Sequence, residues 1–96
     1  MKQYTTPDQT AKLIELGFMP ETRIKGVRTV HSKVEIDHDW NFTIGELIEM
    51  LGVHLSSIYY IGIVWVVNAE GLERRSDELI DALYNMVIKL KKDGVI

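Results

Sequence analysis

The chain has 96 residues, of which 46% are hydrophobic and 26% charged, and its formal net charge is -3. These proportions are those of a folded globular chain, and at this length we expect one domain that covers residues 1–96. The chain has no cysteine, which excludes disulfide scaffolds, thiolate metal sites and thiol nucleophiles and favours a cytoplasmic setting.

The first predicted helix begins near Thr6, Pro7 and Asp8 and ends at Gly17. Thr6 and Asp8 are both candidate caps, and proline fits the first turn of a helix. A glycine just after the last apolar residue is a common C-terminal stop. The apolar face of this helix consists of Ala11, Leu13, Ile14 and Leu16.

The next segment favours extended structure over helix. Residues 34–37 alternate apolar and polar side chains, the pattern of a half-buried strand, so we predict a strand at 33–37. Gly26 and the β-branched residues around it weaken a helix at 23–30, which is a candidate third strand. Residues 38–41 are turn-like.

Thr43 and Glu46 have the spacing of a capping box, in which each side chain bonds the other residue's backbone N–H. They predict a second helix that ends at Gly52. Its apolar face consists of Ile44, Leu47, Ile48 and Leu51.

Residues 57–68 give the strongest strand signal, because they are rich in β-branched and aromatic side chains. Gly62 interrupts this run, so either one long strand bends there or two short strands meet at a tight turn. Residues 68–71 then form a turn. Ser76-Asp77-Glu78 opens the last predicted helix, which runs to Asp93 and stops at Gly94.

These elements predict an α+β fold, a small and mainly antiparallel sheet with three helices. A phrase of paired apolar residues before an acid recurs at Lys12–Leu16, Glu46–Leu51 and Glu78–Leu83. Its spacing would suit a helical repeat array, but the strand signals between the phrases argue against one. The predicted core consists of Leu13, Leu16, Ile36, Leu47, Leu51, Ile63, Trp65, Leu79, Leu83, Val87 and Leu90.

The sequence offers no catalytic, cofactor-binding or metal-binding constellation. Its histidines lack metal-ligand spacing, and no serine lies in a Gly-x-Ser-x-Gly elbow. Asp37-His38-Asp39 is the densest polar cluster, but adjacent strand residues point to opposite faces, which favours a solvated turn. We therefore expect no enzyme, no cofactor and no metal, and a small enzyme is the third-ranked interpretation.

Arg23, Lys25, Arg28 and Lys33 make residues 23–33 basic, with no acid among them. Such a segment could contact a phosphate backbone, or its charges could protect a sheet edge against aggregation. The net charge of -3 argues against a dedicated nucleic-acid binder and favours edge protection. Nucleic-acid binding through these four residues is the alternative function.

Three stretches, Tyr4–Phe18, Phe42–Leu51 and Glu78–Ile96, resemble a group of small uncharacterised bacterial proteins. Many of that group belong to phages and other mobile elements of gut Bacteroidetes. The stretches cover somewhat under half of the chain. The resemblance implies a small cytoplasmic accessory protein and carries over neither an activity nor a site residue.

The preferred function is a non-enzymatic protein-interaction module with a protein partner. No membrane contact is expected, because the longest near-apolar run, 58–67, is about half of what a spanning helix needs. As one straight strand, this run would be apolar on both faces, and a face left uncovered would be an interface. This predicts a homodimer through Ile58, Tyr60, Val64 and Val66; a hairpin at Gly62 would leave only one apolar face.

Overall fold

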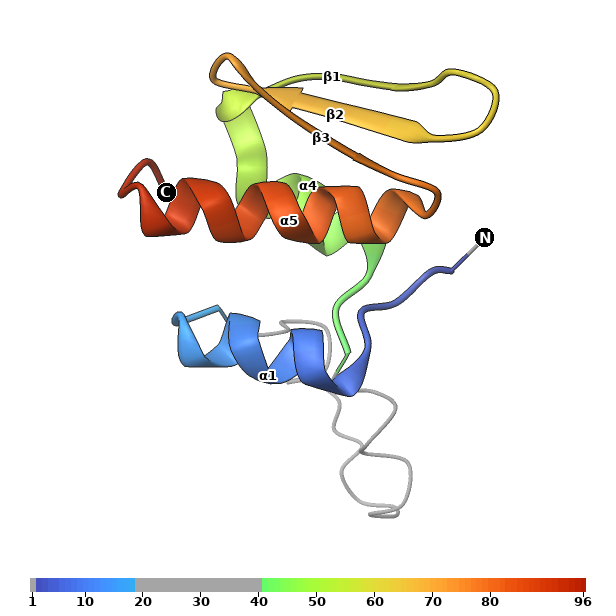
Figure 1. Cartoon of the computed structure of the whole chain (residues 1–96). Helices are drawn as coiled ribbons and strands as arrows, with labels where there is room; N and C mark the ends of the chain where they lie inside the picture. The colour runs from blue at the N-terminus through green and yellow to red at the C-terminus, as the bar shows by residue number, and fades with distance from the viewer. Residues whose placement is uncertain (1, 19–40) are drawn as a thin grey trace.

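The structure is a computed structural model and describes residues 2–18 and 41–96. In chain order, the elements are α1 (Pro7–Glu15), α4 (Ile44–Leu51), the 3-10 helix η2 (Gly52–His54), β1 (Leu55–Tyr60), β2 (Trp65–Ala69), β3 (Leu72–Ser76) and α5 (Leu79–Lys92). Figure 1 shows the sheet on one side of α5 and α1 on the other, with α4 beside α5. The described residues thus confirm the α+β class, with three α-helices and one antiparallel sheet.

Both predicted helix starts in the first half of the chain are confirmed by reciprocal caps. Thr6 Oγ1 accepts the backbone N–H of Gln9 at 3.2 Å, and Gln9 Oε1 accepts that of Thr6 at 2.9 Å. Thr43 and Glu46 form the same pair of bonds, at 3.1 and 2.8 Å. Each cap satisfies backbone donors that the helix itself leaves without partners.

The third strand of the sheet was missed by the sequence analysis. β3 spans Leu72–Ser76, where Glu73, Arg74 and Arg75 hide the strand pattern. Ser76, predicted to open the last helix, ends this strand, and its hydroxyl accepts the Glu78 N–H at 3.2 Å. The strands predicted at 33–37 and 23–30 lie outside the described residues.

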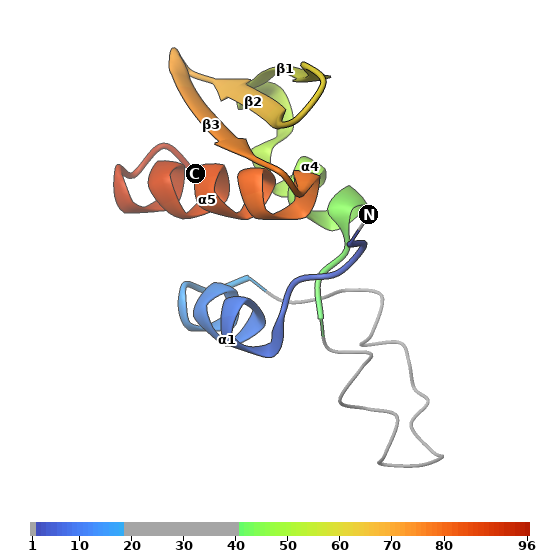
Figure 2. The same ribbon diagram turned by 45° about the vertical axis from the view of Figure 1, so that its right-hand side comes forward.

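The sheet is a meander in the order β1-β2-β3 (Figure 2). At the first turn, the Ile61 N–H donates to the Val64 carbonyl oxygen at 3.0 Å, and Gly62 has φ +97°, which favours glycine. At the second, Ala69 lies opposite Leu72, and the two residues between them, Glu70 and Gly71, both have positive φ. A two-residue loop of this kind is a type I′ turn, which suits the twist of a hairpin.

The hairpin separates the four predicted dimer residues Ile58, Tyr60, Val64 and Val66 onto the two sides of the sheet and the turn. Ile58 lies opposite Val67, which belongs to the core cluster, so Ile58 and Tyr60 share the helix-facing side of the sheet. Val66 lies on the opposite side, and Val64 lies in the turn. The prediction that these residues form one face is therefore wrong, because it required a straight strand through Gly62.

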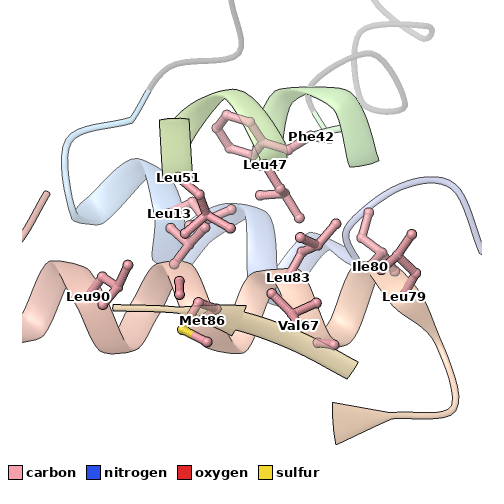
Figure 3. Packing of buried hydrophobic residues seen from close by; sticks show 13 residues of the cluster. Leu13, Phe42, Leu47, Leu51, Val67, Leu79, Ile80, Leu83, Met86 and Leu90 are labelled. Atoms are coloured by element: carbon pink, nitrogen blue, oxygen red, sulfur yellow. The ribbon is translucent and has the colours of Figure 1, made fainter. Parts of the chain in front are cut away.

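The core fills the space between the sheet, α4 and α5, with Leu13 added from α1 (Figure 3). Seven predicted core residues are buried: Leu13, Leu47, Leu51, Leu79, Leu83, Val87 and Leu90. Leu16 and Trp65 are only partly buried, Ile36 lies outside the described residues, and Ile63 is wrong, being 74% exposed in the hairpin turn. The prediction omitted Phe42, Val67, Ala69, Ile80, Ala82 and Met86, all of which belong to the cluster.

A buried polar network joins the start of the chain to the segment before α4. Thr5 Oγ1 accepts the Phe42 N–H at 2.9 Å and lies 2.7 Å from Thr10 Oγ1. Thr10 Oγ1 in turn lies 2.8 Å from Asn41 Oδ1 and 2.9 Å from the Thr6 carbonyl oxygen. Thr5 and Thr10 are 2% and 5% exposed. Their buried hydroxyl groups therefore form hydrogen bonds within the protein in place of hydrogen bonds to water.

Candidate functional site

A shallow cleft of about 330 Å³ lies between β3 and α5. Its lining consists of Arg74, Tyr84, Asn85, Ile88, Lys89 and Lys92. The five residues from α5 recur at helical spacing and share one face of the helix. Arg74 comes from β3, where it lies opposite Val67 and therefore on the side of the sheet that faces α5.

The charges in the lining are all positive. Arg74 Nη1 donates to the Glu73 carbonyl oxygen at 2.9 Å, and no carboxylate of the described residues forms an ion pair with Arg74 or with Lys92. Lys89 lies 3.4 Å from Asp93, one turn further along α5. The neighbouring Arg75 differs, because its side chain pairs with Glu73.

Tyr84 adds a neutral donor to these cations. Burial raises the pKa of its phenol, because ionisation would place a charge in a poorly solvated position. The hydroxyl is protonated at neutral pH, as any phenol with a pKa at or above its ordinary value of about 10 is. Together with the Asn85 amide, it gives the cleft hydrogen-bond donors beside three positive charges, a composition that suits an anion.

The predicted dimer residues, which are the predicted site residues within the described part of the chain, do not line this cleft. Arg23, Lys25, Arg28 and Lys33 lie outside the described residues, so nucleic-acid contact through them stays a prediction. Asp37-His38-Asp39 lies outside them too. The helical spacing of 84, 85, 88, 89 and 92 was visible in the sequence, but only the β2–β3 hairpin brings Arg74 to that helix face.

A second candidate surface is the end of the β1–β2 hairpin. Its exposed apolar side chains are Tyr59, Tyr60, Ile61 and Ile63, which are 43%, 52%, 47% and 74% exposed. The hairpin ends beyond the reach of α5 in Figure 1. Apolar groups gathered in this way mark an interaction site more often than solitary exposed ones do.

The two outer strands of the sheet differ in charge. β3 carries Glu73, Arg74 and Arg75, and charged side chains discourage pairing with another chain. β1 has the sequence Leu-Ser-Ser-Ile-Tyr-Tyr and carries no charge. Among the described residues, no strand pairs with the outer edge of β1.

Residues 2–18 and 41–96 contain no group of three or more histidine and acidic side chains placed to hold a metal ion. Within the same ranges, no helix has the length and apolar character needed to span a membrane. The chain matches no protein-family model, no curated protein and no solved structure. The two surfaces above are therefore interpreted from their own geometry.

Proposed function

We propose that this protein is a non-enzymatic interaction module, and that a second copy of the chain pairs with it along the β1 edge. The observation that carries the proposal is the contrast between the uncharged β1 edge, flanked by exposed apolar side chains, and the charged β3 edge of the same sheet. The resemblance to proteins of phages and mobile elements agrees with a small accessory role in the cytoplasm.

The hairpin register decides which backbone groups a partner could reach. Ile61 and Val64 are joined by a hydrogen bond, and bonded and non-bonded pairs alternate along an antiparallel ladder. Tyr59 therefore directs its backbone N–H and carbonyl toward β2, whereas Ile58 and Tyr60 direct theirs toward the outer edge. The irregularity between Leu55 and Ser57 confines regular pairing to 57–60.

If a two-fold axis passes through Tyr59, the outward-facing backbone groups of both Ile58 and Tyr60 form hydrogen bonds between the two copies. It sets Ile58 of each copy opposite Tyr60 of the other, as hydrogen-bonded pairs, with the two Tyr59 residues facing each other between them. The absence of charge on β1 means that neither copy places like charges opposite each other. The joint sheet would have six strands and would leave the charged β3 strands at its ends.

Disulfide trapping tests this register directly, because the chain has no cysteine of its own. The Tyr59→Cys variant should form a cross-linked dimer on mild oxidation, since facing residues of a non-bonded pair bring their Cβ atoms within disulfide range. Val53→Cys is the matched control, because Val53 is 94% exposed and lies in η2, before β1 and outside the proposed pairing stretch 57–60.

Sedimentation equilibrium provides the second readout. The unmodified chain should show a concentration-dependent dimer, and Tyr60→Lys should weaken it because the new charge lies at the paired edge. Val53→Lys introduces the same charge at an exposed apolar position and should leave the dimer intact. A monomer at all accessible concentrations, with Tyr59→Cys no faster to cross-link than Val53→Cys, would overturn the proposal.

A further inference from the structure

We propose that the cleft between β3 and α5 binds the phosphate group of a small phosphate ester. This role is separate from pairing at β1, because the cleft lies against the other outer strand of the sheet. It rests on the charge of the lining, the donors beside those charges and the size of the cleft.

The cations of the cleft have few anionic partners within the protein. In the described part of the chain, Arg74 and Lys92 form no ion pair, while Lys12, Arg75 and Lys89 each do. Arg74 is also only partly exposed and lies on the side of β3 that faces the core. Its guanidinium has a backbone carbonyl as partner but no carboxylate among the described residues, so an external anion would add a charged hydrogen bond.

The number of donors favours phosphate over carboxylate. A carboxylate carries one charge and two oxygens, whereas a phosphate ester carries about -1.5 to -2 charges and three acceptor oxygens. Arg74 and Lys92 offer two positive charges without an ion-pair partner among the described residues, Lys89 adds a third that is shared with Asp93, and the protonated Tyr84 and the Asn85 amide offer neutral donors. A guanidinium also forms paired bonds to phosphate oxygens, which an ammonium cannot.

The shallow cleft, open to solvent, suits a small ligand. Its volume of 330 Å³ lies near the lower end of the range of about 300–1,000 Å³ for small-molecule sites. That volume holds a phosphate with a modest organic group. The Tyr84 ring and Ile88 supply the apolar part of the lining that such a group would contact.

Phenyl phosphate is the probe, because it combines the phosphate with a small ring. Titrated into the labelled protein and followed by amide chemical shifts, it should give saturable changes at Arg74, Tyr84, Asn85 and Ile88. The binding should weaken as salt is raised. Benzoate, which keeps the ring and exchanges phosphate for carboxylate, should bind about tenfold more weakly, as expected for loss of a charged hydrogen bond.

Three charge-removing variants separate the cleft from general attraction to a basic helix end. Arg74→Gln should weaken phenyl phosphate binding about tenfold, and Lys92→Gln, at an exposed position, about threefold. Lys91→Gln is the matched control, because the Lys91 Nζ lies over the Phe18 ring, 5.4 Å from its centroid, outside the cleft. It should leave the affinity unchanged.

Three results would each overturn the proposal. One is the absence of saturable shifts at the cleft, another is equal affinity for benzoate, and the third is a Lys91→Gln loss as large as that of Lys92→Gln. Because Lys92 is exposed, its variant should fold even if Arg74→Gln does not. Tyr60→Lys alters β1 and the contact of Tyr60 with the Trp65 ring, both outside the cleft, and should not change phosphate binding.

Discussion

Replacing Thr5 by valine tests the buried network that joins the N-terminal segment to residues 41–43. Valine has nearly the same shape as threonine and keeps the Thr5 backbone N–H, which donates to the Phe42 carbonyl oxygen at 2.9 Å. It removes only the hydroxyl that accepts the Phe42 N–H at 2.9 Å and lies 2.7 Å from Thr10 Oγ1. The substitution therefore isolates the hydrogen bonds from the packing.

The proton arrangement in the network decides which bonds are lost. Thr5 Oγ1 accepts from the backbone of Phe42, and the single hydroxyl proton of Thr10 is directed to Asn41 or to the Thr6 carbonyl. Thr5 must then donate its own proton to Thr10. Thr5→Val thus removes the hydroxyl that, within the described residues, accepts the Phe42 N–H and donates to Thr10.

The cost follows from burial, since Thr5 is 2% exposed and Phe42 is fully buried. Leaving a buried N–H unsatisfied costs about 1–3 kcal/mol, and the hydroxyl pair contributes about 1 kcal/mol. The added methyl group offsets about 1 kcal/mol of this. The net loss in the free energy of unfolding should be about 2 kcal/mol, a large share for a domain of this size.

Urea unfolding followed by circular dichroism measures this loss, with an unchanged m-value showing that the same surface is exposed on unfolding. Thr5→Ser is the control, because it keeps the hydroxyl and loses one buried methyl, at about 1 kcal/mol. The reasoning would be refuted if Thr5→Val proved no more destabilising than Thr5→Ser.

Two further predictions concern glycine positions and ionisation. Gly62→Ala should destabilise the protein by about 1 kcal/mol or more, because Gly62 has a φ of +97°. Gly45→Ala should instead stabilise α4 by about 0.5–1 kcal/mol, since the added Cβ would meet nothing nearer than Thr43 Oγ1 at 3.9 Å. Equal urea midpoints for the two variants would contradict this pair of predictions. Burial raises the pKa of Tyr84, so the unfolded chain loses this proton first and stability should fall as pH rises above about 10. Tyr84→Phe should show a smaller fall between about pH 9 and pH 11, measured by urea midpoints, and an identical fall in both proteins would exclude Tyr84 as its source.

Local sequence patterns predicted the helices well, because their signals act over only a few residues. The Thr43 and Glu46 box forms as expected, and Gly94, with φ +78°, follows the end of α5. The same kind of reasoning failed for β3, because a short strand with one apolar residue and three consecutive charged residues has little apolar signal of its own. The backbone of β3 is held in an extended conformation by its pairing with β2, which its own residues do not indicate.

Neither candidate surface could have been recognised from the sequence alone. The cleft needs Arg74 placed over one face of α5, which depends on the β2–β3 register. The pairing edge needs the turn at Gly62, which shifts the alternation so that Ile58 and Val66 lie on opposite sides. The sequence left that turn open between two interpretations, and the hairpin decides between them.

The sequence by itself determined where α1 and α4 begin and which glycine follows the end of α5, because caps and glycine stops are set by neighbouring residues. It also determined most of the buried face of α5, where Leu79, Leu83, Val87 and Leu90 repeat at helical spacing. Only the tertiary structure decided which strands pair and which cations converge. Such contacts join residues far apart in the chain, and their energies come from burial and register, which no local pattern records.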